Sequence, residues 1–285
     1  MIVPGSTSQS LAAALASETG RELATVDYQR FPDGELLAAV PALADGDVAD
    51  VVIVAATTSS DAHVELLQLQ DAAYEADVEH VTTVLPYMGY ARQDAAFDPG
   101  QPISARAVAR AVSTGTDRVV LVNPHEPAVV ARFGVPAETV DACPLLAEPL
   151  PDDLSDPLFL APDDGAIRLA ASVRDAYGRG DTDYFEKTRL SGTEVTIEPS
   201  DAVVEGRDVV VVDDIVATGS TMSEAIALLR ERGADRVLAA CVHPVLARSA
   251  RTRLARAGVE AVVGTDTVER AVSAVSAAPV VAEVL

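Results

Sequence analysis

The chain has 285 residues, with 44 acidic and 21 basic side chains and a formal net charge of −23 at pH 7. This length exceeds one typical domain and fits two, and the negative charge argues against binding to nucleic acid or to an anionic membrane. Because 49% of the residues are hydrophobic, the chain can bury enough apolar surface to fold.

Neither the amino terminus nor the cysteines point to secretion. The first residues, MIVPGSTSQS, lack a basic region followed by a long apolar stretch, so we expect no signal peptide. The longest apolar runs, such as residues 209–212, are much shorter than a membrane span. Cys143 and Cys241 have apolar neighbours and no CxxC spacing, and we expect buried free thiols. These features predict a cytoplasmic protein.

Short runs rich in β-branched residues alternate along the chain with Ala- and Leu-rich helical patterns. In the first half, strands are predicted over 51–56, 81–87 and 118–124, with helices over 62–76 and 104–112. In the second half, strands are predicted over 158–162, 208–214, 236–244 and 260–266, with helices over 167–178 and 223–234. This alternation is typical of βαβ units and a parallel sheet. The sequence therefore predicts an α/β protein with two such units in succession.

A proline- and acid-rich segment, AEPLPDDLSDP at 147–157, is the best candidate for a boundary between the two units. We predict an amino-terminal domain over 1–146, completed by the carboxyl-terminal segment 275–285. The carboxyl-terminal domain is predicted over 147–274.

The two halves resemble divergent copies of one unit. From Asp50 and from Asp208 the chain runs through a buried strand, a small polar loop, a helix and another strand. The match is architectural, and any two βαβ units could show it by chance. The copies differ at the strand end, where the first has alanines and the second has Asp213 and Asp214.

The strongest local motif is VVVVDDIVATGST at 209–221. An apolar strand delivers Asp213 and Asp214 to its carboxyl end, where ligands bind in open α/β sheets. The residues that follow form a turn whose hydroxyl and N–H groups can hold a phosphate: Ala217, Thr218, Gly219, Ser220 and Thr221. Because carboxylates bind vicinal sugar hydroxyls or a divalent cation, the motif predicts a phosphorylated-sugar site. An ordinary helix cap is the alternative, and it does not explain the two adjacent acids.

This motif resembles the ribose-phosphate signature of type I phosphoribosyltransferases. Six further motifs resemble, in order, those of ribose-phosphate diphosphokinases: RFPDGE at 30–35, ATTSSDAHVELL at 56–67, PYMGYARQD at 86–94, APDDGA at 161–166, EKTR at 186–189 and CVHPVL at 241–246. The resemblance spans nearly the whole chain and implies two consecutive domains of phosphoribosyltransferase type. The acidic, lysine-poor composition resembles that of salt-adapted archaeal members, with an ordinary acidic cytosolic protein as the alternative.

The resemblance implies transfer of the diphosphoryl group of ATP to the anomeric hydroxyl of ribose 5-phosphate, with Mg²⁺ as cofactor. The products would be 5-phosphoribosyl 1-diphosphate and AMP. It implies a homo-oligomer, dimeric or built from dimers, whose ATP site is shared between subunits. The ATP-binding residues would be Phe31, Asp33 and Glu35 on one side and Arg92, Gln93 and Asp94 on the other. An exposed turn and a solvated helix start are the respective alternatives.

The resemblance also implies metal ligands and catalytic cations. His125 falls where the family places a metal-binding histidine, although Asn123 stands where an acid is common; a structural histidine is the alternative. Asp163 matches an acid near the sugar and a second metal. Lys187, the only lysine in the chain, and Arg189 would stabilise the moving diphosphoryl group. A charged loop in solvent is the alternative for these two cations.

Three other functions are compatible with such a fold. A type I phosphoribosyltransferase would share residues 213–221 and would not need the FPDGE and ARQD motifs. A noncatalytic regulatory homologue should lack the cations Lys187 and Arg189, which are present. A ligand-sensing transcription factor would need a basic DNA-binding segment, and none is visible. The sequence therefore predicts a ribose-phosphate diphosphokinase.

Overall fold

The structure is a computed structural model that describes residues 1–44, 46, 48–189, 195–199 and 203–285, and the side chains of these residues except 186–199. The chain divides into two compact units. Unit 1 comprises Met1–Asp141, Asp266–Glu269 and Ser276–Leu285, and unit 2 comprises Ala142–Thr265 and Arg270–Val275. Among the described residues, no helix is long and apolar enough to cross a membrane.

The division between the units falls before Ala142, whereas the sequence places the boundary between 146 and 147. The difference arises because the short helix η3 (Cys143–Ala147) packs against helix α4 (Ile167–Tyr177) of unit 2. Cys143 and Leu146 are fully buried in this contact region. The acidic run that follows η3 therefore lies inside unit 2 and does not separate the units.

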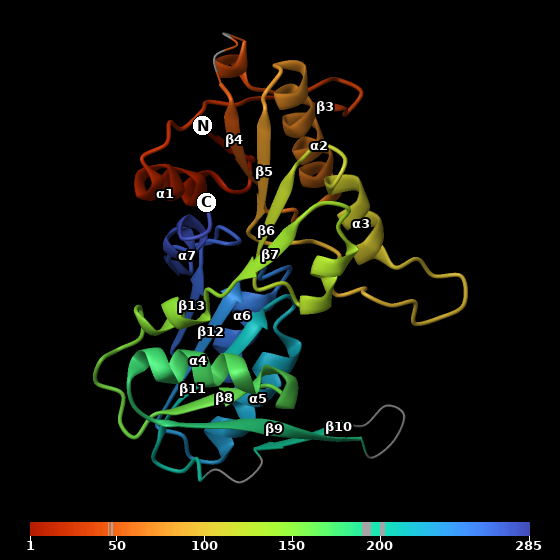
Figure 1. The fold of residues 1–285 in the computed structure, drawn as a ribbon. Helices are drawn as coiled ribbons and strands as arrows, with labels where there is room; N and C mark the ends of the chain where they lie inside the picture. Colours follow the sequence, from red (N-terminus) through yellow and green to blue (C-terminus); the bar gives the residue numbers. More distant parts are fainter. Residues whose placement is uncertain (45, 47, 190–194, 200–202) are drawn as a thin grey trace. The chain divides into compact units, whose positions relative to one another are not determined.

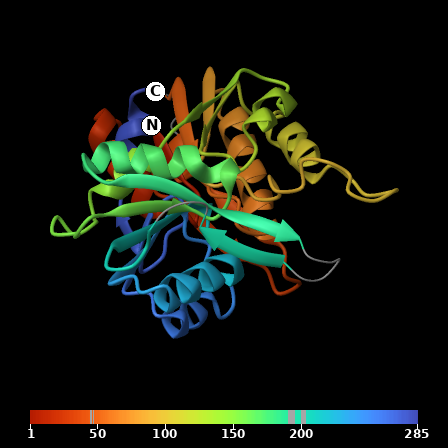
Figure 2. The same ribbon diagram turned by 90° about the horizontal axis from the view of Figure 1, so that it is seen from below.

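Unit 1 contains a five-stranded parallel sheet with the order β1-β4-β5-β6-β7 (Figure 1). Its strands are β1 (Ile2–Pro4), β4 (Asp50–Val54), β5 (His80–Leu85), β6 (Arg118–Val122) and β7 (Ala137–Val140). Helices α2 (Ser60–Glu75) and α3 (Ser104–Val112) cover one face, and α1 (Gln9–Thr19) covers the other (Figures 1 and 2). Because both faces are covered, strands such as β4 read as continuous apolar runs.

Further elements complete unit 1. A separate antiparallel hairpin is formed by β2 (Asp27–Arg30) and β3 (Leu36–Ala39), and β3 packs against α2. The short helices η1 (Pro41–Leu43) and η2 (Pro127–Arg132) lie in the connections. The carboxyl-terminal helix α7 (Ala278–Ala282) packs against α1, which explains why the end of the chain belongs to the first unit (Figure 1).

Unit 2 contains a seven-stranded sheet with the order β10-β9-β8-β11-β12-β13-β14. Its strands are β8 (Leu158–Ala161), β9 (Asp181–Arg189), β10 (Val195–Pro199), β11 (Asp208–Ile215), β12 (Arg236–His243), β13 (Ala261–Thr265) and β14 (Ser273–Val275). All neighbours are parallel except β9 and β10. Helix α4 covers one face, and α5 (Ser220–Glu231) and α6 (Ala250–Ala257) cover the other (Figure 2). The short helix η4 (Asp164–Ala166) follows β8.

The two units share one succession of elements. In each, a strand, a helix and an antiparallel hairpin precede the next strand of the sheet, and β1-β4-β5-β6-β7 corresponds to β8-β11-β12-β13-β14. The predicted α/β class with two parallel sheets is confirmed, as are the predicted strands and helices. The order of strands also supports the predicted repeat, because β4 in the sheet of unit 1 corresponds to β11 in the sheet of unit 2.

Candidate functional site

Two adjacent acids stand at the carboxyl end of β11. The Asp213 carboxylate accepts a hydrogen bond from the Asp214 N–H at 2.9 Å, and the Asp214 carboxylate accepts one from the Ile215 N–H at 2.7 Å. Burial and, next in size, repulsion from Asp214 raise the pKa of Asp213 well above its ordinary value. Ionisation of Asp213 is therefore unfavourable in the free protein. A ligand that donates hydrogen bonds to the carboxylate, or a cation that neutralises it, would stabilise the ionised form.

Asp163 joins these acids at the same edge of the sheet. It follows β8, which pairs with β11 in parallel register. Its carboxylate also contributes to the raised pKa of Asp213, so the three acids interact electrostatically. Oxygen donors of this kind suit Mg²⁺, which proteins commonly bind through one or two carboxylates together with substrate phosphates. Within the described residues, no three or more His, Cys, Asp or Glu side chains are grouped into a metal cage.

The turn after β11 leads into an uncapped helix. Gly219, at φ 71°, is the N-cap of α5, and among the described residues no side chain caps the helix. The first turn of α5 contains no acidic residue. The hydroxyl oxygens of Thr218 and Ser220 lie 3.2 Å apart beside this helix start. Exposed N–H groups at the positive end of a helix dipole, with hydroxyls beside them, form a binding site for an anion such as phosphate.

The equivalent turn in unit 1 is built differently. Ser59 caps α2 by accepting a hydrogen bond from the Ala62 N–H at 3.1 Å, and Asp61 adds a negative charge in the first turn. At the end of β4, Ala55 and Ala56 stand where unit 2 has its acid pair. The helix start of unit 1 is therefore satisfied by its own side chains, whereas the described residues at the corresponding turn of unit 2 leave room for a phosphorylated sugar.

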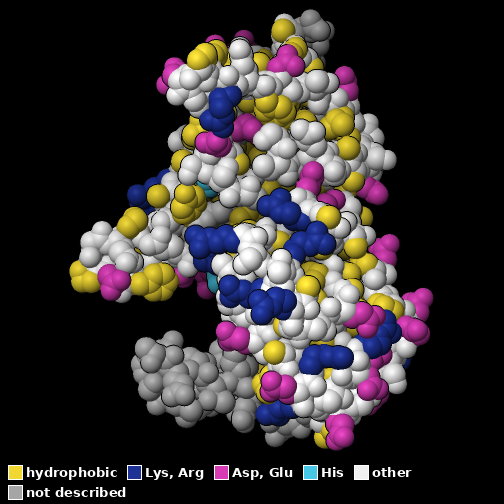
Figure 3. Space-filling model, turned by 180° about the vertical axis from the view of Figure 1, so that it is seen from behind, with side chains coloured by type: hydrophobic (Ala, Val, Ile, Leu, Met, Phe, Trp, Pro, Cys, Tyr) yellow, Lys and Arg dark blue, Asp and Glu magenta, His cyan; other side chains and the backbone are white. Residues whose placement is uncertain are grey.

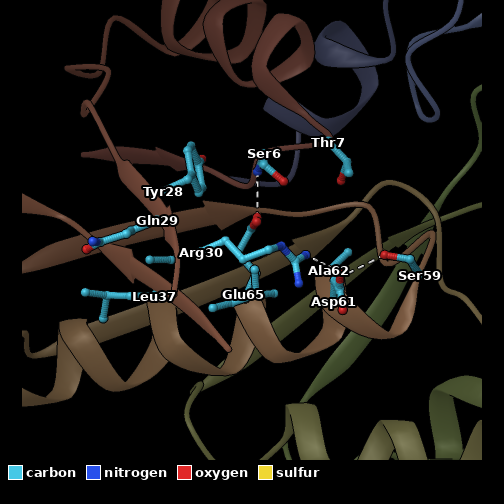
Figure 4. A pocket seen from close by; sticks show the side chains of 12 residues that line it. Ser6, Thr7, Tyr28, Gln29, Arg30, Leu37, Ser59, Asp61, Ala62 and Glu65 are labelled. Atoms are coloured by element: carbon cyan, nitrogen blue, oxygen red, sulfur yellow. Dashed lines mark hydrogen bonds and ion pairs between the residues drawn. The ribbon is translucent and has the colours of Figure 1, made fainter. Parts of the chain in front are cut away.

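A cavity of about 340 Å³ lies beside this turn in unit 1, between the hairpin β2–β3, the start of α2 and the loop before α1 (Figure 4). Glu65 is buried there and accepts a hydrogen bond from the Ser6 N–H at 2.6 Å. At its rim, Arg30 pairs with Asp61 at 2.5 Å. None of the site residues predicted from the sequence lines this cavity, and its two carboxylates disfavour a phosphate.

The predicted adenine-binding residues stand at the tip of the hairpin β2–β3. Phe31, Asp33 and Glu35 are all exposed, and Phe31 retains 38% of its surface. The tip is closed by two backbone hydrogen bonds of 2.9 Å, from Phe31 N–H to Glu35 O and from Gly34 N–H to Phe31 O. Gly34 has φ 97°, a conformation that glycine adopts without strain. The hairpin thus presents an aromatic ring and two carboxylates to the surroundings.

The other predicted ATP-binding residues follow β5. Arg92 is exposed, whereas Gln93 and Asp94 are partly buried. Gln93 anchors the segment to the start of α3, because its carbonyl oxygen accepts the Ala105 N–H at 3.1 Å and its side chain accepts a hydrogen bond from the Ser104 hydroxyl. No hydrogen bond or ion pair between described residues joins these three residues to the hairpin tip.

The start of this segment packs tightly against the loop after β4. The Gly89 N–H donates to Thr57 Oγ1 at 2.9 Å, and a side chain at Gly89 would overlap the Thr57 carbonyl oxygen. The next residue, Tyr90, has φ 64°, and its ring centroid lies 5.4 Å from that of His63. Burial lowers the pKa of His63, which favours a neutral imidazole. These contacts join loops that follow different strands, so no local sequence pattern predicts them.

His125 is exposed in the loop after β6. Asn123, which precedes it at φ 35°, donates from its side-chain amide to Asp141 Oδ1 at 2.7 Å. The resemblance leads us to expect an acid at position 123, and the asparagine found there is hydrogen-bonded to the acidic side chain of Asp141. Asp141 follows the next strand, β7, and no motif in the sequence marks it as a site residue.

Lys187 and Arg189 lie on β9, opposite Ile197 and Val195 of β10. Their side chains lie outside the described residues. Their predicted catalytic role therefore remains a prediction.

Two α/β units of one topology, with an acid pair and an open anion-binding turn in the second, define a protein with tandem domains of phosphoribosyltransferase type. A family model described as the N-terminal domain of ribose phosphate pyrophosphokinase matches residues 1–115. A model described as a phosphoribosyl transferase domain matches residues 145–275.

Full-length relatives identify the family. The ribose-phosphate pyrophosphokinase of Halobacterium salinarum is 65% identical over 285 residues, which cover 100% of both chains. That of Methanosarcina mazei is 44% identical over 100% of this chain and 94% of its own. The crystal structure of phosphoribosylpyrophosphate synthetase from Mycobacterium smegmatis superposes with a TM-score of 0.84 at 29% identity, covering 100% of this chain and 96% of that one. The chain belongs to the ribose-phosphate pyrophosphokinase family, and the predicted likeness to salt-adapted archaeal members is confirmed.

Proposed function

We propose that the chain transfers the diphosphoryl group of ATP to ribose 5-phosphate, forming 5-phosphoribosyl 1-diphosphate and AMP. The observation that carries this proposal is the identity of 65% over the whole chain to a ribose-phosphate pyrophosphokinase. The acid pair and uncapped helix of unit 2 support it, because they provide the groups that a phosphorylated sugar requires.

Ribose 5-phosphate is assigned to unit 2. Asp213 and Asp214 would accept hydrogen bonds from the vicinal hydroxyls of the sugar. These hydrogen bonds would offset the free-energy cost of ionising the buried Asp213 carboxylate. The 5-phosphate would lie against the backbone N–H groups of residues 217–221 at the start of α5. These contacts hold the sugar in one orientation, so that its anomeric hydroxyl is presented to the β-phosphorus of ATP.

ATP is assigned to unit 1. Arg92 would contact the phosphates, with Gln93 and Asp94 holding the segment and the nucleotide. The exposed tip of the hairpin, with Phe31, Asp33 and Glu35, would contact adenine from a second copy of the chain. This arrangement requires a homo-oligomer, and the exposed aromatic ring at the tip supports it, because such a ring gains by stacking on a base.

Mg²⁺ is the cofactor generally used by this family, and the donor groups suit it. When bound, Mg²⁺ neutralises phosphate charge and polarises the phosphorus under attack. Asp163 would hold one ion through its carboxylate oxygens. His125 would hold another, and Asp141, bonded to Asn123, would supply the negative charge that an acid at position 123 would otherwise provide.

Lys187 and Arg189 are assigned to the transfer step. Phosphoryl transfer needs positioning and cationic stabilisation of the charge spreading over phosphate oxygens, rather than covalent catalysis. A chain with a net charge of −23 must supply this positive charge locally. A compact ammonium group on a flexible stem can follow the moving group without the geometric demands of a planar guanidinium.

The test is an assay with ribose 5-phosphate, ATP and Mg²⁺ at several salt concentrations, in which AMP, ADP and diphosphorylated sugar are measured together. Equal amounts of AMP and diphosphorylated sugar are expected, whereas ADP would indicate transfer of a single phosphoryl group. Lys187→Ala should lower turnover by about 10³-fold, the order found for catalytic cations of this kind. The absence of AMP at every salt concentration would refute the proposed reaction.

A further inference from the structure

One arginine outside the recognised motifs contacts the turn of residues 217–221 in unit 2, to which we assign the 5-phosphate. Arg253 of α6 donates from Nη1 to the Ser220 hydroxyl oxygen at 2.5 Å. Ser220 is the first residue of α5 and directly follows Gly219. Helices α5 and α6 pack side by side within unit 2, so the contact joins neighbouring elements of one compact body. Among the described side chains, Arg253 is the one cation that hydrogen-bonds to residues 217–221.

The surroundings of Arg253 are unusually positive for this chain. Four exposed arginines lie on α6 or directly before it, and no ion pair engages them within the described residues: Arg248, Arg251, Arg253 and Arg256. Figure 3 shows the face that bears α5 and α6, where arginine side chains gather. In a chain of net charge −23 with 44 acidic residues, a group of unpaired arginines forms a local attraction for an anion.

The start of α5 differs from the start of α2 in unit 1 in both capping and charge. In unit 1, the start of α2 is capped by Ser59 and carries Asp61, so its positive end is satisfied by the protein itself. In unit 2, α5 has no side-chain cap from the described residues and no acid in its first turn, and Arg253 adds a positive charge. Both differences favour an incoming anion at α5.

We propose that Arg253 binds the 5-phosphate of ribose 5-phosphate. Its guanidinium would donate to phosphate oxygens from the position where it now contacts Ser220, while the N–H groups of the turn donate from the other side. The planar guanidinium suits phosphate because it donates two parallel hydrogen bonds. The proposal rests on the proposed function for the identity of the sugar. It adds a positively charged side chain to the site, because the turn itself contains none.

Arg253→Gln removes the charge while keeping a side chain that can still bond to Ser220. We expect the KM for ribose 5-phosphate to rise about 10- to 100-fold, as for the loss of charge-assisted hydrogen bonds, with kcat and the KM for ATP changing much less. Arg253→Lys should recover part of the affinity, because it retains the charge and loses the paired geometry. Arg251→Gln is the matched control, since it removes the same charge from α6 two positions away, on another face of the helix.

A second measurement does not depend on activity. Ribose 5-phosphate should raise the melting temperature of the parent and of Arg251→Gln, and should raise that of Arg253→Gln much less, because a ligand stabilises only the state that binds it. Unphosphorylated ribose should show no such difference between variants. If the parent formed no AMP, this ligand-induced shift would still test Arg253 separately from the proposed reaction.

Three results would overturn the proposal. Equal losses of affinity in Arg253→Gln and Arg251→Gln would indicate a general field effect without direct contact. A lower melting temperature of Arg253→Gln with unchanged affinity would indicate that the arginine only ties α6 to α5. No shift of the parent with ribose 5-phosphate would mean that the turn does not bind this sugar phosphate.

Discussion

Gly89→Ala tests whether the segment that bears Arg92 depends on close contact between two loops. Gly89 lies after β5, and its N–H bonds to Thr57 Oγ1 at 2.9 Å. The Thr57 N–H in turn bonds to Tyr87 O at 2.9 Å. A Cβ at position 89 would need about an ångström more space than the Thr57 carbonyl oxygen leaves, so the two loops would have to separate.

The magnitude of the change in stability follows from one stabilising and two destabilising contributions. Because Gly89 has no positive φ, alanine restricts the unfolded chain and would by itself stabilise the protein by about 0.4–1 kcal/mol. Overpacking costs about 1–3 kcal/mol, and loss of the hydrogen bond to Thr57 costs about 1 kcal/mol. The clash prevails, and the free energy of unfolding should fall by about 1–3 kcal/mol.

The assay combines denaturant unfolding at fixed salt with the KM for ATP, which should rise several-fold because the displaced segment carries Arg92, to which we assign contact with the ATP phosphates. Gly134→Ala is the control, since a Cβ there would meet no atom nearer than Ser113 Cβ at 3.5 Å. The control should be as stable as the parent or slightly more stable. A Gly89→Ala variant with unchanged stability and unchanged KM for ATP would refute the reasoning.

Three further outcomes follow from the structure. Because burial and Asp214 raise the pKa of Asp213, the folded protein holds this proton more tightly than the unfolded chain, so Asp213→Asn should stabilise the ligand-free protein above neutral pH by roughly 1 kcal/mol. The gain should vanish towards pH 4 in denaturant unfolding at several pH values; a gain independent of pH would contradict it. The Glu269 carboxylate accepts hydrogen bonds from two N–H groups at the start of α1, at 2.5 and 3.2 Å. Glu269→Ala should therefore lower the free energy of unfolding by about 1 kcal/mol, measured as a lower denaturation midpoint. An unchanged midpoint would contradict this capping role. Burial raises the pKa of the Cys241 thiol, so iodoacetamide at pH 8 should alkylate it only after unfolding; rapid labelling of the native protein would contradict its burial.

The central strands could be predicted because burial on both faces leaves a simple signal. Residues 209–212 are fully buried, and such strands read as continuous apolar runs. Other elements lack this signal. All four residues of β2 (Asp27–Arg30) are exposed, and α6 buries only Ala250 and Leu254 beneath a surface rich in arginine. Their formation depends on the neighbours they pack against, which local composition does not reveal.

The boundary between the units is a second feature that local composition does not locate correctly. Composition marks the acidic run 147–157, because such segments commonly link domains. Cys143 and Leu146, just before it, are fully buried, and η3 packs against α4 of unit 2. Which side of a boundary a short segment joins is decided by the core that buries its apolar side chains.

By itself, the sequence determined the family and the α/β class, and it predicted the motif that we assign to the sugar phosphate. Each of these is visible in short runs of neighbouring residues, so it can be recognised without the three-dimensional structure. Only the tertiary structure decided which distant groups join that motif. The pairing of β8 with β11 brings Asp163 to the edge that holds Asp213, and the packing of α6 on α5 brings Arg253 to Ser220. Such contacts depend on strand register and helix packing between segments far apart in the chain, and no local pattern encodes them.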